Sequence, residues 1–446
     1  MRLEAAAIWS LLAGYLLLPS GMKIDLPLLP PIDKNNVTVL TTFLYCAARG
    51  APRPRGSVGM LLPFLAACYV LAPIGASFGN SYELRVGNFS LPGFYLLDGV
   101  KGSINNLIQI SAFYIGLRFL SSATGRLEIL KAFVASMLMY SVPMLAEERL
   151  SPQLHNWVYG YSPFSFIEHV RWNGYRPVVF LPQGLQLALF VAMALIAACA
   201  LARVRLKVMR LSARLAALYL VPILIMCKTL AAGIYAVALA PLALFARPTT
   251  SVKVATALMV FVCAYPALRT QDLVPIESVV SMATNVSKAR ADSFVTRIEN
   301  EGILMAKANQ KPVFGWGGWG RNRVYSSLQS KDVSITDGGW IIYFGVYGWV
   351  GFLGLFGMFA VSVHRLHFYV KSADDVDAKI AAGLALLLAA NIADMLPNAN
   401  LTPITFIIAG SIARRVYARA PLATAESRIS RMEPPTPIAE PSLLSE

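Results

Sequence analysis

Charged residues are scarce in this chain. Asp, Glu, Lys and Arg make up 14% of its 446 residues, whereas soluble domains have about 25%. Apolar segments recur from residue 5 to residue 418 with no soluble block between them. The composition therefore excludes an ordinary soluble protein and favours one membrane domain over residues 1–419. Residues 420–446 are rich in Pro and Ser and are predicted to form a disordered cytoplasmic tail.

Cysteine and histidine are also rare. All five cysteines lie inside apolar runs without metal-ligand spacing, so we interpret them as small apolar side chains. The four histidines are His155, His169, His364 and His367. A DxD-like string from Asp374 to Asp377 falls in a predicted cytoplasmic loop, where a solvated loop or a helix cap is the better interpretation. We predict no metal and no other cofactor.

The middles of the apolar runs have almost no ionisable residues, and Asp394 lies at the end of one of them. Proton-coupled pumps carry carboxylates in the middle of the membrane. The chain also has no repeat of fixed period and no two halves with matching broken helices, which many transporters have. Both absences count against a transporter. The scarcity of ionisable residues in the middles of the runs places reactive groups in outer loops or at the membrane ends of helices.

Twelve apolar segments are candidates for spans, since a helix needs about 20 residues to cross the hydrocarbon core. We therefore predict an all-α polytopic membrane protein. The predicted spans are residues 4–20, 36–49, 58–76, 103–121, 127–146, 183–203, 211–227, 229–246, 252–270, 338–364, 378–396 and 399–418. The second is short. The seventh and eighth meet at Lys228, which predicts either a tight outer turn or one broken helix.

The formal net charge of +15 does not indicate a nucleic-acid partner, because the Lys and Arg residues form no stripe. They concentrate in alternate short loops, as the positive-inside rule predicts for cytoplasmic loops. Examples are Arg49, Arg53, Arg55, Arg126, Arg203, Arg205, Lys207, Arg210, Arg247, Arg365, Lys371, Arg414 and Arg415. Both termini are then cytoplasmic, and the loops at about 77–102, 147–182 and 271–337 lie outside.

The longest polar segment is the predicted outer loop 271–337. An amphipathic helical pattern over about 276–310 predicts a helix on the membrane surface or across the helix ends. Arg suits phosphate oxygens because of its planar fork. Any single Arg here can be a solvated or headgroup-facing charge, but the positive-inside rule does not explain the set. Its members are Arg290, Arg297, Arg321 and Arg323.

Glycine and tryptophan are concentrated around the end of this loop. The segment Lys311 to Arg321 reads Lys-Pro-Val-Phe-Gly-Trp-Gly-Gly-Trp-Gly-Arg; Asp337-Gly338-Gly339-Trp340 follows, and then Gly345-Val346-Tyr347-Gly348-Trp349-Val350-Gly351. The segment Lys311 to Arg321 matches a phosphate-binding loop only weakly, because no strand precedes it. Turns and close helix packing explain the glycines equally well.

These motifs resemble those of the O-antigen and exopolysaccharide polymerases and the O-antigen ligases, which are polytopic glycosyltransferases of the GT-C type. Arg297 matches the basic residue before the Pro-x-Phe-Gly motif, here Pro312 to Gly315. Arg176 resembles the Arg that precedes a Pro-containing start of a middle span. The motifs that carry the resemblance cover about residues 290–355, and the rest of the chain resembles the family in topology alone.

The resemblance implies glycan transfer from an undecaprenyl-diphosphate carrier to a sugar hydroxyl, with inversion and without a metal. The expected location is the periplasmic face of the bacterial inner membrane, with membrane lipid and a chain-length regulator as further partners and no nucleic acid. Fixed Arg or Lys can stabilise a leaving diphosphate as a metal would.

The expected diphosphate ligands are Arg176 and Arg297, with Arg321, Arg323 and Lys228 as helpers. Lys228 departs from the family, where Ser-Arg is commoner at this turn, so it keeps the charge but loses the bidentate grip. Two further residues complete the expected substrate site. Trp316 could stack on a sugar or belong to an interfacial aromatic belt, and Glu147 could position an acceptor.

Asp337 is the expected catalytic residue. Ligases of the family typically have a His at this position, which could serve as base toward a sugar hydroxyl; Asp is often seen in polymerases. Asp337 could equally cap the next helix. His155 and His169 lie outside, near Arg176, and stay open as site residues.

From this resemblance we expect the chain to be a polysaccharide repeat-unit polymerase. The first alternative is an O-antigen ligase. The second is a flippase for lipid-linked oligosaccharides, which would line a central cavity with charges from several spans.

Overall fold

The computed structural model describes residues 3–26, 29–50, 56–171, 174–275, 281, 288–326 and 331–414, with the backbone alone for 288–294. The predicted tail at 420–446, most of the first half of the predicted amphipathic segment, and the side chain of Arg290 lie outside the described part. Everything below concerns the described residues.

The fold is helical. Six of its described helices are long and apolar enough to cross a membrane: α3 (Leu61–Phe78), α5 (Ala123–Leu150), α7 (Gly184–Arg203), α10 (Pro248–Thr270), α13 (Gly339–Ser372) and α14 (Asp375–Asp394). Four shorter apolar helices are α1 (Leu3–Leu17), α8 (Ala213–Met226), α9 (Leu230–Phe245) and α15 (Pro403–Ile412). The other helices are α2 (Lys34–Arg49), α4 (Leu96–Phe119), α6 (Leu154–Tyr159), α12 (Lys288–Ala308) and the 3-10 turn Phe166–His169.

Each predicted span overlaps one of these helices, but six rather than twelve meet the length and hydropathy needed for a crossing. The six helices that do not meet them are either short, as α8 and α15 are, or polar. For example, α4 includes Asp98, Asn105, Asn106 and Gln109. Lys228 forms a turn with φ +49° between two separate helices, α8 and α9, and this settles the choice between a turn and a broken helix.

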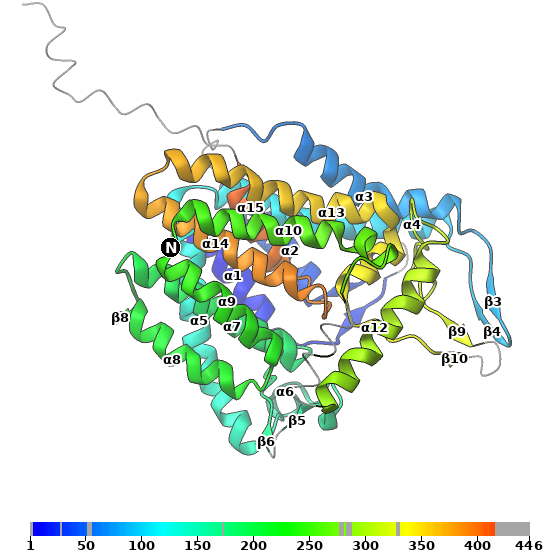
Figure 1. Cartoon of the computed structure of the whole chain (residues 1–446), viewed down its shortest axis with the longest axis horizontal. Coiled ribbons are helices and arrows are strands. Elements are labelled where there is room, and N and C mark those ends of the chain that lie inside the picture. The colour runs from blue at the N-terminus through cyan, green and yellow to red at the C-terminus, as the bar shows by residue number, and fades with distance from the viewer. Residues whose placement is uncertain are drawn as a thin grey trace, which may run out of the picture.

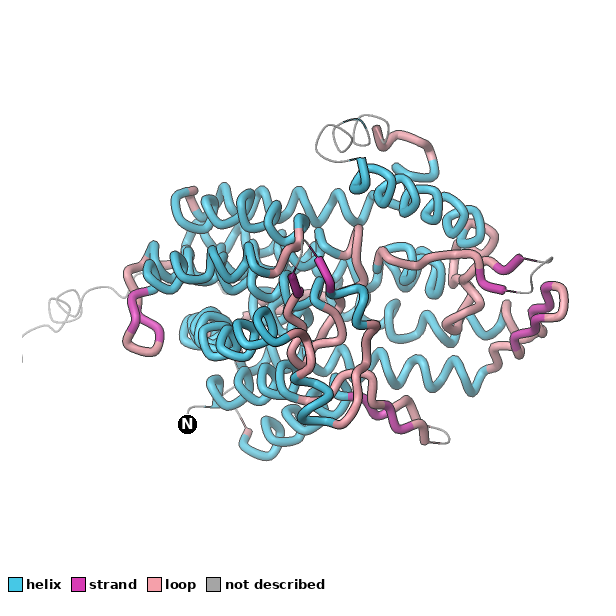
Figure 2. The backbone as a smooth tube through the Cα atoms, turned by 90° about the horizontal axis from the view of Figure 1, so that it is seen from below, coloured by secondary structure: helices cyan, strands magenta, loops and turns pink. Residues whose placement is uncertain are grey.

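The strands form five two-stranded antiparallel hairpins in the connections, as Figure 2 shows. They are β1–β2 (Lys23–Ile24, Ile32–Asp33), β3–β4 (Leu84–Val86, Phe89–Leu91), β5–β6 (Val170–Arg171, Gly174–Tyr175), β7–β8 (Lys207–Val208, Leu211–Ser212) and β9–β10 (Tyr325–Ser326, Lys331–Asp332). In Figure 1 the β7–β8 hairpin and the N-terminus lie at the left end of the bundle, and β3–β4 and β9–β10 at the right. The β5–β6 hairpin lies apart from both, at the bottom of the view.

Burial differs among the long helices in the way a membrane requires. α7 and α14 are enclosed by other helices, with 89% and 78% of their apolar windows buried. α3 and α10 are only 33% and 39% buried, and they leave side chains such as Phe64 and Val260 exposed. Such long exposed apolar faces are rare on soluble monomers, and they agree with a polytopic membrane protein.

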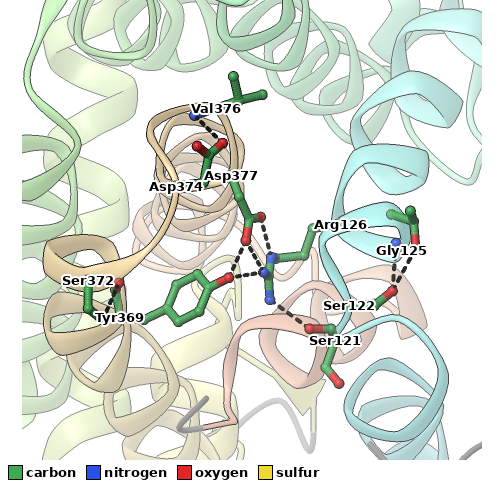
Figure 3. Close-up of polar contacts among 10 residues, drawn as sticks. Ser121, Ser122, Gly125, Arg126, Tyr369, Ser372, Asp374, Val376 and Asp377 are labelled. Atoms are coloured by element: carbon green, nitrogen blue, oxygen red, sulfur yellow. Dashed lines mark hydrogen bonds and ion pairs between the residues drawn. The ribbon is translucent and has the colours of Figure 1, made fainter. Parts of the chain in front are cut away.

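A buried ion pair joins three helices at one end of the bundle (Figure 3). The Arg126 guanidinium in the first turns of α5 contacts the Asp377 carboxylate of α14 at 2.6 Å and donates to the hydroxyl of Tyr369 in α13. It also donates to the carbonyl of Ser121 at 2.7 Å. The Arg126 and Asp377 side chains are only 4% and 13% exposed. This pair therefore fixes the ends of α5, α13 and α14 against one another.

The acidic string beside it has structural partners. Asp374 caps α14 by accepting from the backbone N–H of Val376, and Asp375 pairs with Lys379. With Asp377 bound to Arg126, all three carboxylates are engaged. The interpretation of Asp374 as a helix cap is confirmed.

Replacing Arg126 by Ala leaves Asp377 buried without its partner, which costs about 3–5 kcal/mol in comparable cases. We expect a clear fall in the Tm of the purified protein in detergent, measured by scanning fluorimetry. Arg85→Ala is the matched control, because Arg85 pairs with Glu83 in an exposed hairpin. Equal melting temperatures for Arg126→Ala and Arg85→Ala would contradict the structural role of the buried pair.

Candidate active site

Arg297 and Asp337 meet in one cavity. Arg297 lies on α12, and Asp337 lies just before α13; the Arg297 Nε atom is 3.1 Å from Asp337 Oδ2. The cavity has a volume of about 290 Å³, and Glu301, Tyr265 and Pro397 also line it. The expected catalytic residue and one of the two expected diphosphate ligands are therefore brought together from segments 40 positions apart in the chain.

Asp337 is held in place by the start of α13. The N-cap residue of α13 is Gly338, and no side chain caps it, so the N-cap interpretation of Asp337 is wrong. The backbone N–H groups of Gly339 and Trp340 donate to carbonyls of Asn398 and Met395, in the connection between α14 and α15. A Cβ on Gly338 would lie 2.4 Å from the Leu396 carbonyl oxygen, so this close approach requires glycine.

The Arg297–Asp337 pair is accessible. Its two side chains are 37% and 39% exposed. Pairs with this exposure contribute about 0–1 kcal/mol. A bound anion can therefore take over the guanidinium at small cost, which is not true of the buried Arg126–Asp377 pair.

Glu301 is a cavity residue that the sequence analysis missed. It lies one helical turn after Arg297 on α12, and this i,i+4 spacing is the signal that could have indicated it. Its carboxylate accepts from the Trp340 indole N–H at 3.3 Å and from the Tyr265 hydroxyl at 3.4 Å. Burial raises the pKa of Glu301, and the Trp340 hydrogen bond and the charge of Arg269 only partly offset this. The cavity thus has two carboxylates in different environments.

Arg176 and Lys228 form a second cationic group. Arg176 follows β6, is 8% exposed, and donates to the Lys228 carbonyl at 3.3 Å. The Lys228 ammonium contacts Glu148 at 2.9 Å and donates to the Tyr175 carbonyl at 2.9 Å. Burial, with a contribution from Arg171, lowers the pKa of Arg176. The structure therefore places two of the expected diphosphate ligands side by side.

His155 and His169, the two histidines left open as site residues, differ in their hydrogen bonding. His155 is held by the Ser20 N–H and the Tyr161 carbonyl, so its role is structural. His169 is 2% exposed, and neither ring nitrogen has a hydrogen-bond partner among the described residues. Burial and the nearby charges of Arg176 and Arg171 lower the pKa of His169 to about 4, so it is neutral at physiological pH.

Contacts through the α14–α15 connection join the cavity to α9, the helix that follows Lys228. An Arg297 Nη1–H donates to the Pro397 carbonyl at 3.5 Å. The neighbouring Asn398 donates to Asp394, whose carboxylate also bonds Tyr235 of α9. Tyr235 is seven positions after Lys228, or about 10 Å along a helix. Both groups therefore lie at the same end of the bundle.

Glu147 has a different role from the one expected. Its carboxylate accepts from the backbone N–H groups of Val178 and Val179, both at 2.7 Å, and from Leu154 at 3.2 Å. The side chain is 1% exposed. Because three backbone donors occupy the carboxylate, Glu147 holds the loop after Arg176 in place and does not face an acceptor.

The Pro-x-Phe-Gly segment is inserted into a break in α13. Gly348 has φ +60° and ψ −166°, which interrupts the helix. The N–H groups of Trp349 and Val350 donate to Pro312 and Val313 carbonyls, while the carbonyls of Gly345 and Val346 accept from Trp316 and Gly317. Two lost i→i−4 bonds are thus replaced by four bonds to the loop. The glycines serve this backbone contact, as the packing interpretation proposed.

Trp316 is also structural. It is 4% exposed, its indole N–H donates to the Lys307 carbonyl at 2.8 Å, and the Lys307 ammonium lies 3.6 Å from the ring centroid. A covered ring cannot stack on a sugar, so this expectation has to be revised.

Arg321 and Arg323 are not in the Arg297 cavity. Arg321 is 3% exposed, donates to the Pro92 carbonyl at 2.8 Å and lies over the ring of Tyr82. Arg323 pairs with Asp332 at 2.6 Å. Their contacts tie the loop after the Pro-x-Phe-Gly segment to its surroundings.

Within the described residues, no group of three or more His, Cys, Asp or Glu side chains is placed to hold a metal ion. No family model matches the chain, and no curated protein matches it. The resemblance to glycan polymerases therefore rests on the sequence motifs.

Gly315→Ala should destabilise the protein by about 2–4 kcal/mol, since Gly315 has φ +68° and a Cβ would lie 2.5 Å from the Val346 carbonyl carbon. The matched control is Gly357→Ala within α13 itself. A Cβ on Gly357 would meet only side-chain atoms of Leu65, the nearest at 3.5 Å. We expect thermal unfolding in detergent to show a lower Tm for the first variant alone. A Tm for Gly315→Ala equal to that of the control would disprove the backbone insertion.

Proposed function

We propose that the chain is a polysaccharide repeat-unit polymerase for O-antigen or exopolysaccharide. It is a metal-independent, inverting GT-C glycosyltransferase of the bacterial inner membrane, with its site on the periplasmic face. The single observation that supports this most is the Arg297–Asp337 pair in one cavity. A cation for a phosphate and a carboxylate for a hydroxyl are the two groups that metal-free glycosyl transfer from a diphosphate needs.

In the proposed reaction the acceptor hydroxyl oxygen attacks the anomeric carbon of the carrier-linked sugar. The bond from that carbon to the diphosphate oxygen breaks, and its electron pair stays on the diphosphate. Asp337 takes the hydroxyl proton, and Arg297 binds the developing charge on the diphosphate. The weak resting pair is suited to this, because Arg297 can leave Asp337 for the phosphates and so free the carboxylate for the hydroxyl.

An apolar groove supports a lipid-linked donor. It has a volume of about 790 Å³, runs between α7, α8 and α9, and has Lys228 at one end and Arg214 near the other. Lys228 and Arg176 at its outer end would meet the diphosphate when the polyprenyl chain lies in the groove. Glu148 now holds Lys228, as Asp337 holds Arg297.

Deleting the gene should leave single repeat units on the carrier at the outer face, as measured by sizing carrier-linked and surface glycans. Wild-type protein should restore polymer. Arg297→Ala and Arg176→Ala should lower it about 10²–10³-fold, the usual cost of removing one donor to a developing negative charge. Arg85→Ala, which changes an exposed hairpin charge, should restore polymer fully.

Protein amount and Tm are measured for each variant, so that loss of activity is separated from loss of fold. Normal polymerisation by both Arg297→Ala and Arg176→Ala would disprove the site. Unaltered chain length with lost attachment to lipid A would indicate a ligase instead, and repeat units trapped inside the cell would indicate a flippase.

A further inference from the structure

A second surface groove runs along α10 where it packs beside α13. Its volume is about 630 Å³. The apolar part consists of the outward side of α10, with Val260 56% and Phe261 42% exposed. Ala257, Ala264 and Leu268 continue this apolar face.

Cationic and titratable groups gather at one end of this groove. Lys253, in the second turn of α10, and His364 and His367, near the end of α13, line it. His367 lies within electrostatic range of His364, Lys253 and Lys371. None of the ion pairs found in the described part of the chain involves any of these four side chains. The positive charges of Lys253 and Lys371 thus have no carboxylate partner in the described part of the chain.

We propose that this groove binds an acidic phospholipid, with its phosphate at Lys253, His364 and His367 and an acyl chain along α10. From Lys253 to Leu268 the helix rises about 22 Å, more than the roughly 15 Å depth of one leaflet. Basic pockets between helices on the cytoplasmic side are suited to acidic headgroups. The N-terminal end of α10 adds its own partial positive charge.

The far ends of the same two helices line the Arg297 cavity. Tyr265 of α10 and Ile341 of α13 both contact it. A lipid bound along α10 beside α13 would hold these two helices together and so stabilise the Arg297 cavity that they line. The binding inference itself does not depend on glycosyl transfer.

The test uses purified full-length protein, delipidated in a neutral detergent. Phosphatidylglycerol or phosphatidylcholine is added at equal concentrations, and bound lipid is counted by native mass spectrometry while Tm is followed. The wild type should bind phosphatidylglycerol and gain Tm, with phosphatidylcholine much weaker. The triple variant K253Q/H364Q/H367Q should weaken phosphatidylglycerol binding about tenfold or more and lose the preference.

The matched control is R205Q/K207Q/R210Q, which removes three cationic side chains from the connection around the β7–β8 hairpin and should keep the preference. K253Q alone provides a milder variant if the triple one is unstable. The proposal fails if the triple variant, or K253Q in its place, keeps full selectivity, or if the control loses it equally. It also fails if inorganic phosphate alone reproduces the Tm gain, because the groove would then bind a free anion.

Discussion

The structure depends on the insertion of the Pro312–Gly317 segment into the break of α13. A helix in a membrane must satisfy its backbone groups internally, and a break at Gly348 would leave two donors and two acceptors without partners. The loop supplies all four hydrogen bonds. The same insertion anchors the C-terminal end of α12 beside α13, and so positions Arg297 against Asp337. The glycine and tryptophan pattern thus has a structural role, and the residues proposed for chemistry lie next to it.

Burial separates the ion pairs of this protein into two kinds. Arg126–Asp377 is enclosed and shares its donors with Tyr369 and Ser121, so it holds helices together. Arg297–Asp337 is more than a third exposed and lines a cavity, so an anion can replace Asp337 at the guanidinium. Lys228–Glu148 is intermediate, at 11% and 18% exposed, beside the groove proposed for the carrier lipid.

Hydropathy predicted the positions of the helices well, because each apolar run became a helix. It did not predict which helices meet the length and hydropathy of a crossing, since α8 and α9 have only 14 and 16 residues and α15 is much shorter than the predicted span 399–418. Motif resemblance predicted Arg297 and Asp337 as site residues, and the structure brings them together. Trp316 and Glu147 could not be predicted correctly, because their partners are backbone groups that only the folded chain brings to them. Glu301 was missed because its site is formed by Trp340 and Tyr265 from other helices.

The central claim is that Arg297 binds the diphosphate while Asp337 accepts the acceptor proton. The most direct test uses purified Arg297→Ala and Asp337→Asn proteins and measures two quantities separately: binding of undecaprenyl diphosphate, and turnover of carrier-linked repeat units. The account predicts that Arg297→Ala weakens carrier binding. Asp337→Asn should bind the carrier as well as the wild type or better, because Arg297 has lost its resting partner, and yet lose turnover about 10²–10⁴-fold. Equal loss of carrier binding in both variants, or normal turnover in Asp337→Asn, would contradict it.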